Sequence, residues 1–422
     1  MVQFNLVKLQ FSKWGVIMYT KQDIEILRAL AREKAEIAKD PRQAENIKLW
    51  SATNDNKMTK PPIYIYQLPW NEMDYEDELT LQTTDPYLRE IELKLRREIY
   101  CWKHLPGNMV VTDVFECPIV FHNSGFGISE DVDVVKTDDT SDVASRHFNI
   151  QIRGMDDIHK IKEPVITVDH EQTQKNFDLL QEIFGDILKV EKTGIKGVWF
   201  APWDNLIRLT GIEEAMMDLI LQPEYIDKLV ERYVDVSLIM LERYKELGLW
   251  ASNNDNVCVG SGGYGYCSDL EPADQHRENT PTSQIWGCGN AQIFSEVSEK
   301  MHWDFSLKHE LRWLEKFGLT YYGCCEPLQN KMDILQKIPN LRKVSMSPWS
   351  KIDKVVDMVG KKYVLSCKPS PAIFAEDTFR PEQAKADILD ILTKANGASL
   401  ELIMKDVSTV RYQPQRVWGS VN

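Results

Sequence analysis

The chain has 422 residues, of which 43% are hydrophobic and 27% are charged, and its formal net charge is −14. These values are typical of a globular protein with a buried core, and the acidic balance argues against a nucleic-acid partner, whose binding depends on clustered Lys and Arg. The eight cysteines lack a disulfide-type spacing and no secretory signal is evident. We therefore expect reduced thiols in a cytoplasmic protein that does not span a membrane.

The N-terminal quarter of the sequence predicts helices and no sheet. Residues 1–17 are mildly apolar but too short and too charged to cross a bilayer, and we expect them to be a non-native or disordered leader. Thr20 can cap a helix that starts at about Lys21, and the apolar spacing predicts helices over 20–39 and 86–104 around an irregular segment. Residues 18–107 are interpreted as a helical extension.

From residue 108 onward, short apolar runs alternate with helical patterns. The predicted strands are 109–114, a less regular run at 150–152 or 165–168, 198–201, 256–260, 319–322, 343–346, 363–366 and 400–404. The predicted helices are 171–187, 213–247, 291–317, 328–337, 350–359 and 381–395. Such alternation implies a parallel sheet. Eight strands in this order predict an α/β fold, a closed (β/α)8 TIM barrel over 108–422, with an open doubly wound sheet as the alternative.

Polar residues gather where the predicted strands end. Chemistry in such barrels takes place at the carboxyl ends of the strands. The ends carry Glu116, Asp204, Gly260–Gly265, Cys324-Cys325-Glu326, Ser345, Ser347, Ser366-Cys367-Lys368 and Lys405-Asp406. This distribution predicts a pocket at that end of the sheet.

The segment Tyr321-Tyr322-Gly-Cys-Cys-Glu-Pro is the strongest candidate for the reactive centre. Its functional interpretation is a zinc site built from Cys324, Cys325 and Glu326 with a more distant ligand, Glu310 or Cys367. The structural interpretation is one buried cysteine beside an exposed one. Zinc would keep a thiolate nucleophilic or polarise a substrate heteroatom.

Two further motifs are candidate parts of the pocket. Gly260-Ser-Gly-Gly-Tyr-Gly265 matches the dinucleotide fingerprint, but no helix pattern follows at once, so a flexible active-site loop that includes Gly262 and Tyr264 is favoured. Lys405-Asp406 is either a surface ion pair or a pair that binds a carboxylate or transfers a proton, and the second interpretation is favoured.

Aromatic side chains also stand beside acids in this sequence. Trp70 with Glu72, and Trp203 with Asp204, either pack with a capping acid or stack a flat ligand. No His-Glu-x-x-His, Gly-x-Ser-x-Gly or phosphate-loop motif occurs in the sequence.

Over roughly residues 60–420 the chain resembles the uroporphyrinogen decarboxylase superfamily, and most closely its corrinoid-linked methyltransferase branch. The residues that carry this resemblance are Pro202-Trp-Asp204 with the following Thr-Gly-Ile-Glu-Glu-Ala-Met, Leu221-Gln-Pro-Glu224, Ala291-Gln-Ile-Phe294 with Val297-Ser298 and Met301-His302, Tyr322-Gly-Cys-Cys-Glu-Pro327, Val344-Ser-Met-Ser-Pro-Trp349, Lys368-Pro-Ser-Pro371 and Lys405-Asp406. The resemblance implies the (β/α)8 barrel and places Trp349 and Lys368 among the substrate contacts.

The sequence departs from the family pattern in two places. The decarboxylases grip tetrapyrrole carboxylates with an Arg-rich segment, whereas residues 66–73 here contain no arginine. Methyltransferases of the coenzyme M type ligate zinc through His-x-Cys and a later Cys, whereas Tyr322 stands at the His position and no Cys follows Cys367. A zinc site here would need a different ligand set, drawn from Glu310, Cys325 or Glu326.

The resemblance implies a methyltransferase that moves a methyl group from a small O- or N-methylated substrate to the cobalt of a partner corrinoid protein. We expect Cys324, Glu326, Lys405 and Asp406 to be catalytic. The alternatives are a cofactor-free decarboxylase using Lys368, Lys405, Arg208 and Arg411, methyl transfer from methylcobamide to a thiol, and a non-catalytic binding protein. A monomer and a homodimer both remain open.

Overall fold

The computed structural model describes residues 6–12, 15–135, 145–273 and 279–418 of a mixed α/β protein. Its central element is a six-stranded, wholly parallel sheet. In spatial order the strands are β10 (Trp286–Gly289), β11 (Leu319–Tyr322), β12 (Leu341–Met346), β13 (Val364–Cys367), β14 (Leu400–Met404) and β3 (Ile63–Ile65). Because all six strands run the same way, their carboxyl ends meet at one edge.

Further strands pair outside this sheet. β4 (Val114–Pro118) is parallel to β9 (Lys189–Thr193), and Ile195 forms a single parallel bridge to Trp250. The antiparallel pairs are β1 (Leu6–Ser12) with β2 (Gly15–Thr20), β5 (Phe121–Asn123) with β8 (Ile166–Val168), and β6 (Val132–Val135) with β7 (Ser145–Phe148). Among the described strands no ladder joins β3 to β4 or β9 to β10. Strand pairing thus shows the six-stranded sheet, and closure into a ring stays a prediction.

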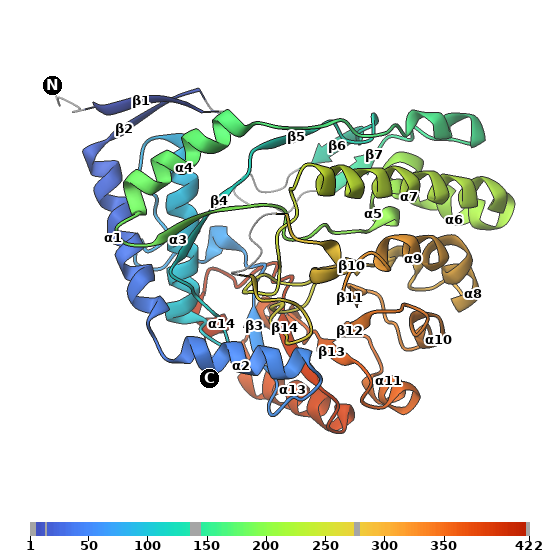
Figure 1. The fold of residues 1–422 in the computed structure, drawn as a ribbon. Coiled ribbons are helices and arrows are strands. Elements are labelled where there is room, and N and C mark those ends of the chain that lie inside the picture. Colours follow the sequence, from blue (N-terminus) through green and yellow to red (C-terminus); the bar gives the residue numbers. More distant parts are fainter. Residues whose placement is uncertain (1–5, 13–14, 136–144, 274–278, 419–422) are drawn as a thin grey trace.

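Helices cover the sheet and form a separate N-terminal layer (Figure 1). They are α1 (Lys21–Ala38), α2 (Arg42–Asn54), α3 (Pro86–His104), α4 (His170–Phe184), α5 (Pro202–Thr210), α6 (Ile212–Leu221), α7 (Pro223–Glu246), α8 (Glu299–His302), α9 (Lys308–Leu314), α10 (Met332–Leu335), α11 (Ile352–Val359), α12 (Ala372–Ala375), α13 (Pro381–Ala395) and α14 (Gln415–Trp418). Shorter turns include η1 (Trp70–Glu72), η5 (Gln292–Phe294) and the π-helical η6 (Trp303–Leu307). None of the helices in the described residues combines the length and apolar character needed to cross a bilayer.

The first helix begins as its sequence predicts. The Thr20 hydroxyl accepts the backbone N–H of Asp23 at 3.1 Å, and the Asp23 carboxylate accepts the backbone N–H of Thr20 at 2.8 Å. This reciprocal capping box satisfies two of the N–H groups that a helix start leaves unpaired. The predicted cap at Thr20 is confirmed.

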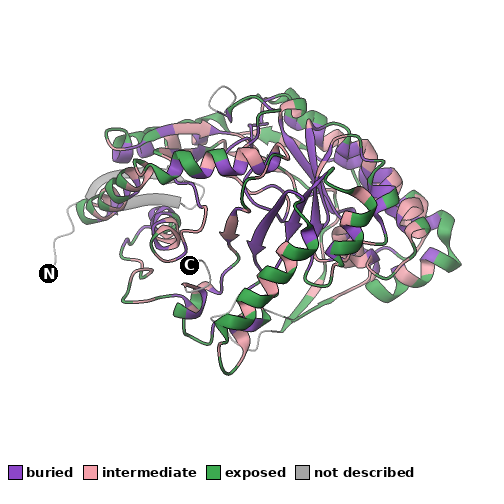
Figure 2. Cartoon of the chain, turned by 90° about the horizontal axis from the view of Figure 1, so that it is seen from below, coloured by how far each residue is buried: buried purple, intermediate pink, exposed green. Residues whose placement is uncertain are grey.

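The core is centred on the sheet. All residues of β10, β11, β13 and β14 are buried, and Figure 2 shows these strands between helices whose outer faces are exposed. A parallel sheet covered on both faces needs strands that are apolar throughout, not alternating ones. This requirement explains why the runs at 319–322 and 400–404 could be predicted.

Three of the predicted strands are wrong. Residues 198–201 and 256–260 form no strand, and the predicted run at 109–114 gives way to β4, which begins only at Val114. In that run side chains bind the backbone instead of a neighbouring strand. The Val111 N–H donates to Gln43 at 2.8 Å, and the Asn256 side chain donates to the Val110 carbonyl at 3.0 Å.

Other elements were mispredicted or missed. Residues 150–152 do not form a strand. The alternative run at 165–168 contains β8, which pairs antiparallel with β5. The predicted helix over 213–247 ends at Leu221 and restarts at Pro223, because Pro cannot continue a helix but suits its first turn. The hairpin of β1 and β2 lies in the region that was expected to be a non-native or disordered leader. β3 and β10 were not predicted either, and β3 lies in the segment assigned to the helical extension.

Candidate active site

A tight turn follows β11 and carries the cysteine pair. Gly323 has φ = +99°, and a Cβ there would meet Leu328 Cδ1 at 2.5 Å, so the position needs glycine. The turn lets the Cys324 N–H donate to Glu326 Oε2 at 2.8 Å. The Ser345 hydroxyl, at the end of β12, donates to the Cys324 carbonyl at 2.6 Å. Neighbouring strand ends therefore fix the backbone of this segment.

The turn opens onto a cavity of about 610 Å³. Acids and apolar side chains make up most of its wall, and none of its lining residues in the described chain is Lys, Arg or His. The wall is formed by Asp204, Ile207, Ile212, Gln292, Ile293, Ser295, Glu296, Cys325, Glu326, Pro327 and Trp349. The structure thus brings together four predicted site residues: Asp204, Cys325, Glu326 and Trp349.

Glu326 is a buried acid in the cavity wall. Glu326 is only 2% exposed. Burial raises the pKa of Glu326 to about 7, although the hydrogen bond from the Cys324 N–H favours the ionised form. Near neutral pH this carboxyl therefore exists in both protonation states, and its buried Oε1 lacks a hydrogen-bond partner among the described residues.

A second buried acid, Glu310 on α9, stands behind the first. Burial raises the pKa of Glu310 to about 8, and the negative charge of Glu326 acts in the same direction. The Ser306 hydroxyl donates to the Glu310 carboxyl. The hydroxyl of Tyr322, which also interacts with Glu310, lies 2.9 Å from His302 Nε2. Glu310 thus belongs to the interior face of the site and does not line the cavity.

The two thiols of the turn differ in chemical character. Their sulfur atoms are 3.5 Å apart, and the hydrogen bond from Cys324 lowers the pKa of Cys325 to about 7, with the nearby Lys405 ammonium acting in the same sense against burial. The same contact and burial raise the pKa of Cys324 well above its ordinary range. Cys325 lines the cavity and is the more nucleophilic of the two.

Lys368 lies beneath the turn and not in the cavity wall. Its ammonium is 2.5 Å from the Tyr321 hydroxyl and 2.9 Å from the Ser345 hydroxyl, and burial lowers the pKa of Lys368 to about 8. Because Ser345 in turn holds the Cys324 carbonyl, Lys368 positions the turn. Its predicted contact with substrate has no support in this placement.

Lys405 and Asp406 form an ion pair at the end of β14. Lys405 is buried and acts electrostatically on both cysteines, whereas Asp406 is exposed. Neither residue lines the cavity. The Lys405 charge favours the thiolate form of Cys325 in the turn. The predicted proton transfer by Lys405 and Asp406 stays a prediction.

Trp70 and Glu72 make contacts that stabilise the fold. The Glu72 carboxylate accepts the Thr409 hydroxyl at 2.8 Å and the Val410 N–H at 2.7 Å, and the Arg97 guanidinium lies 4.6 Å from the Trp70 ring centre. These contacts hold the segment after β14. They do not bring either side chain to the cavity of 610 Å³.

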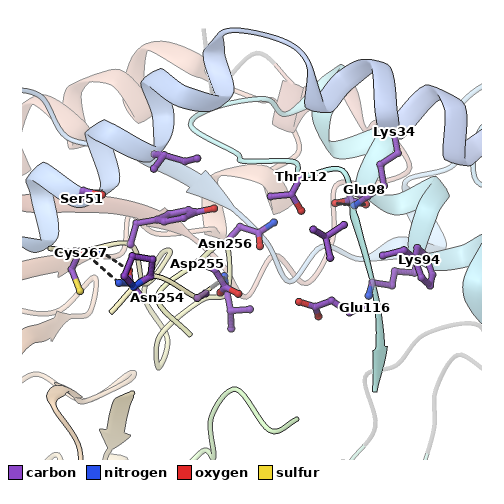
Figure 3. Close-up of a pocket in the computed structure, with 17 residues that line it drawn as sticks. Lys34, Ser51, Lys94, Glu98, Thr112, Glu116, Asn254, Asp255, Asn256 and Cys267 are labelled. Atoms are coloured by element: carbon purple, nitrogen blue, oxygen red, sulfur yellow. Dashed lines mark hydrogen bonds and ion pairs between the residues drawn. The ribbon is translucent and has the colours of Figure 1, made fainter. Parts of the chain in front are cut away.

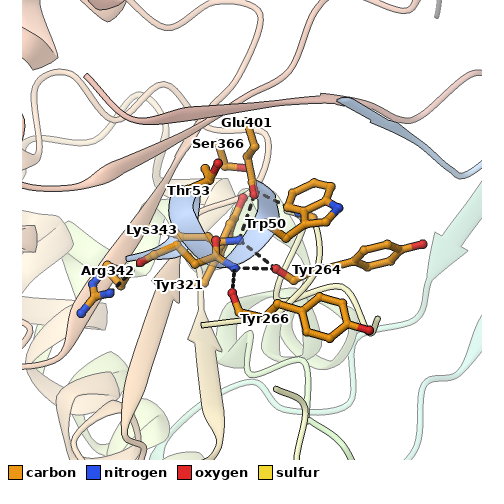
Figure 4. A network of polar contacts seen from close by, with 12 residues as sticks. Trp50, Thr53, Tyr264, Tyr266, Tyr321, Arg342, Lys343, Ser366 and Glu401 are labelled. Atoms are coloured by element: carbon orange, nitrogen blue, oxygen red, sulfur yellow. Dashed lines mark hydrogen bonds and ion pairs between the residues drawn. The ribbon is translucent and has the colours of Figure 1, made fainter. Parts of the chain in front are cut away.

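Tyr264 lies in a buried polar layer shown in Figure 4, and Gly262 belongs to the same loop. There Lys343 Nζ is 2.9 Å from Glu401 Oε2, both side chains are fully buried, and Glu401 also accepts the Gly263 N–H at 3.0 Å. Tyr264 packs on Trp50 and is 3% exposed, and a Cβ at Gly262 would meet Glu401 at 2.4 Å. The expected flexible substrate loop is instead a packed part of the interior.

The predicted zinc ligands do not converge. The described chain contains no group of three or more His, Cys, Asp or Glu side chains that could hold a metal ion. Cys367 is fully buried among apolar side chains, and Glu310 is bound by Ser306. The donor set therefore does not fit zinc.

A second cavity, of about 440 Å³, lies between the N-terminal helices and the loop at 254–257 (Figure 3). Most of its charged side chains are paired: Lys34 Nζ is 2.7 Å from Glu98, and Lys196 forms ion pairs with Glu116 and Asp255. Lys94 lies over the Phe115 ring, 5.3 Å from its centre. Glu116 was predicted at a strand end, and it faces this cavity and not the one at Cys325. No chemistry follows from these paired groups.

Sequence reasoning missed several cavity residues, namely Gln292, Ser295, Glu296 and the apolar Ile207, Ile212 and Ile293. Gln292 matters most, because its side-chain N–H donates to Asp204 Oδ2 at 3.0 Å. The only signal was the segment Ala291-Gln292-Ile293-Phe294, which was noted for its family resemblance and was not assigned a role in the site.

Comparisons with known proteins give little guidance. No family model matches the chain, and no curated protein matches it. A solved structure of a methyltransferase from Methanosarcina mazei is similar in shape, with a TM-score of 0.49 and 9% sequence identity over 89% of this chain and 97% of that chain. Nothing about the activity of this protein follows from a likeness of that degree.

Proposed function

We propose that the protein is a methyltransferase that removes a methyl group from the oxygen or nitrogen of a small substrate and delivers it to the cobalt of a corrinoid carried by a partner protein. The observation that carries this proposal is Glu326, a buried acid with an unpartnered oxygen in the wall of a cavity of about 610 Å³. Such an acid suits a reaction in which a poor leaving group must take up or keep a proton.

The chemistry asked of this chain is mainly proton placement. A corrinoid supplies, when bound, the nucleophile that accepts the methyl group. When the carbon–heteroatom bond breaks, its electron pair stays on the heteroatom, and the proton of Glu326 neutralises the charge that develops there. A neighbouring carboxyl with a pKa raised to about 8, Glu310, keeps further negative charge out of the site. Asp204, held by Gln292, and Trp349 would orient the substrate.

We also propose that the sheet closes into a (β/α)8 barrel. The parallel pair β4–β9 and the bridge from Ile195 to Trp250 support this, because they supply parallel segments beyond β3 and β10. In a barrel the cavity at the carboxyl end of β11 would occupy the usual position of an active site.

One alternative, methyl transfer to a thiol, has a supporting observation. Cys325 lines the cavity, and the pKa of Cys325 is lowered to about 7 by Cys324. The decarboxylase alternative has no supporting observation. Arg208 is paired with Glu130 at 3.1 Å, and Arg411 is paired with Asp377 at 2.7 Å. Lys368 is enclosed by hydroxyl groups. These cations do not form a pocket for an acidic substrate.

The decisive experiment mixes the purified protein with a cobalt(I) corrinoid protein and a panel of methyl ethers and methylamines while the cobalt absorbance is followed. We expect methylation of the cobalt with at least one donor and a loss of about 100-fold or more in Glu326→Gln. With methyl ethers, to which Glu326 must supply the proton, the rate should fall as pH rises through about 7. Glu213→Gln, an exposed change of the same charge on α6, is the matched control. No cobalt methylation with any donor, or methyl-Cys325 detected by mass spectrometry without cobalt methylation, would contradict the proposal.

A further inference from the structure

The cavity beside Cys325 has an unbalanced distribution of charge. Asp204, Glu296 and Glu326 all line it, Glu310 lies directly behind, and no Lys, Arg or His belongs to its described wall. Burying a carboxylate without a compensating cation is costly. The described wall of the cavity supplies no cation to balance Glu326 when this buried carboxyl is ionised.

Two cations close to the cavity are engaged by other acids. Arg208, which lies near Asp204, has its guanidinium 3.1 Å from Glu130. Lys405, which lies near the two cysteines, is paired with Asp406. Neither the Arg208 guanidinium nor the Lys405 ammonium forms an ion pair with Glu326.

The rest of the wall is apolar. Ile207, Ile212, Ile293 and Pro327 surround the acids, and Trp349, which is 70% exposed, presents its ring at the cavity. Aromatic faces attract organic cations, and apolar side chains favour methyl groups over a hydrated metal ion. Charge and surface together select a small, methylated and positively charged molecule.

We propose that the cavity binds a small N-methylated ammonium ion, whose N–H is directed at the Glu326 carboxyl while its methyl groups contact Trp349 and the isoleucines. The inference rests on the proposed methyl transfer and narrows its substrate from methyl ethers and amines to methylammonium ions. It also gives the acids a role. In the ionised form Glu326 holds the proton on nitrogen, so that when the methyl–nitrogen bond breaks its electron pair leaves with a neutral amine that keeps its N–H.

Binding of such a cation must be linked to protons. The groups that face Glu326 are Cys324, Cys325, Glu310 and Tyr322, and none of them is a cation. A bound ammonium ion favours the ionised form of Glu326 and so lowers its pKa. At pH 7, where a part of Glu326 is protonated, binding should therefore release protons.

The test is calorimetric titration of the full chain at pH 7 with trimethylammonium chloride, in two buffers that differ in ionisation heat. Tert-butanol, an uncharged molecule of similar shape, serves as the second probe. We expect trimethylammonium to bind at least tenfold more tightly than tert-butanol, with proton release that shows as a buffer-dependent heat. Glu326→Gln should lose at least tenfold in affinity and most of the proton release, whereas Glu213→Gln should behave as the wild type.

Equal affinity for the two probes, no binding of trimethylammonium, or binding without proton release would each overturn the inference. The wild-type measurements decide this even if the Glu326 variant does not fold. The outcome is separate from that of the cobalt assay: methyl ethers that methylate cobalt while ammonium ions do not bind would refute the inference alone. Trimethylammonium that binds with proton release while no donor methylates cobalt would refute the methyltransferase alone.

Discussion

Cys324 and Cys325 are adjacent in the sequence, yet the fold gives their thiols opposite chemistry. Cys324 is 9% exposed and its hydrogen bond favours the thiolate of its neighbour, while Cys325 faces the cavity. Glu326, the next residue, is a weakened acid in the same wall. Three consecutive residues thus provide a thiol donor, a thiolate and a proton carrier within one turn.

This difference predicts selective alkylation. At pH 7 iodoacetamide should modify Cys325 first, because only the thiolate reacts and the pKa of Cys325 is lowered to about 7. The rate should rise with pH through that value. Peptide mass spectrometry of briefly treated protein measures it, and Cys324→Ala, which removes the hydrogen-bond donor, should slow the modification of Cys325 at pH 7 by raising its pKa. Faster labelling of Cys324 would contradict the assignment.

The sequence was informative about this turn and silent about its surroundings. Cys324, Cys325 and Glu326 stood out because three ligand-type residues follow an apolar run and precede a proline. The roles of Gln292 and Glu296 could not be predicted, because they depend on which strand ends become neighbours in space. The predicted zinc ligands do not come together for the same reason: Glu310 and Cys367 have suitable donor atoms but face other partners.

At the scale of elements, the end of β11 depends on a single glycine. In Gly323→Ala the new Cβ would meet Leu328 at 2.5 Å and Ser345 at 2.9 Å, and φ = +99° is unfavourable for alanine. We expect a loss of roughly 1–3 kcal/mol in unfolding free energy and slower reaction of Cys325, because the turn is displaced. Urea unfolding and the alkylation rate test this. Gly360→Ala, also at positive φ but with open space around it, is the control.

The strands β12 and β14 are joined by the buried pair of Lys343 and Glu401. Lys343→Met would leave the Glu401 carboxylate uncompensated, and removing one partner of a buried pair costs about 3–5 kcal/mol. The double variant Lys343→Met, Glu401→Gln should recover part of that loss. Urea unfolding of the three proteins measures it, and a single variant as stable as the wild type would contradict this account.

Element prediction succeeded where local sequence decides and failed where distant contacts do. β14 and α13 were predicted with their observed bounds, since an all-apolar run and a proline-started amphipathic repeat are local signals. β3 is Ile-Tyr-Ile, a strand-type run that is too short to be predicted without its partner β14.

For the whole molecule, the buried acids make stability depend on pH. The pKa of Glu310 is raised to about 8 in the folded protein, against about 4.3 for an unperturbed glutamate. Between these values the folded chain binds more protons than the unfolded one, so the unfolding free energy falls as pH rises through that window. Thermal unfolding from pH 5 to 9 should show a decline that is smaller in Glu310→Gln and unchanged in Glu213→Gln. An equal decline in all three would contradict the burial of Glu310 as an uncompensated acid.

The pairing of β3 with β14 has a consequence for how the protein is made. The two strands are more than 330 residues apart, and β14 is the last strand of the described chain. At roughly 5–20 residues per second, a ribosome needs on the order of 20–70 s to reach the partner after β3 is synthesised. During that interval the β3 segment has an unsatisfied edge, and the six-stranded sheet is completed only as translation finishes.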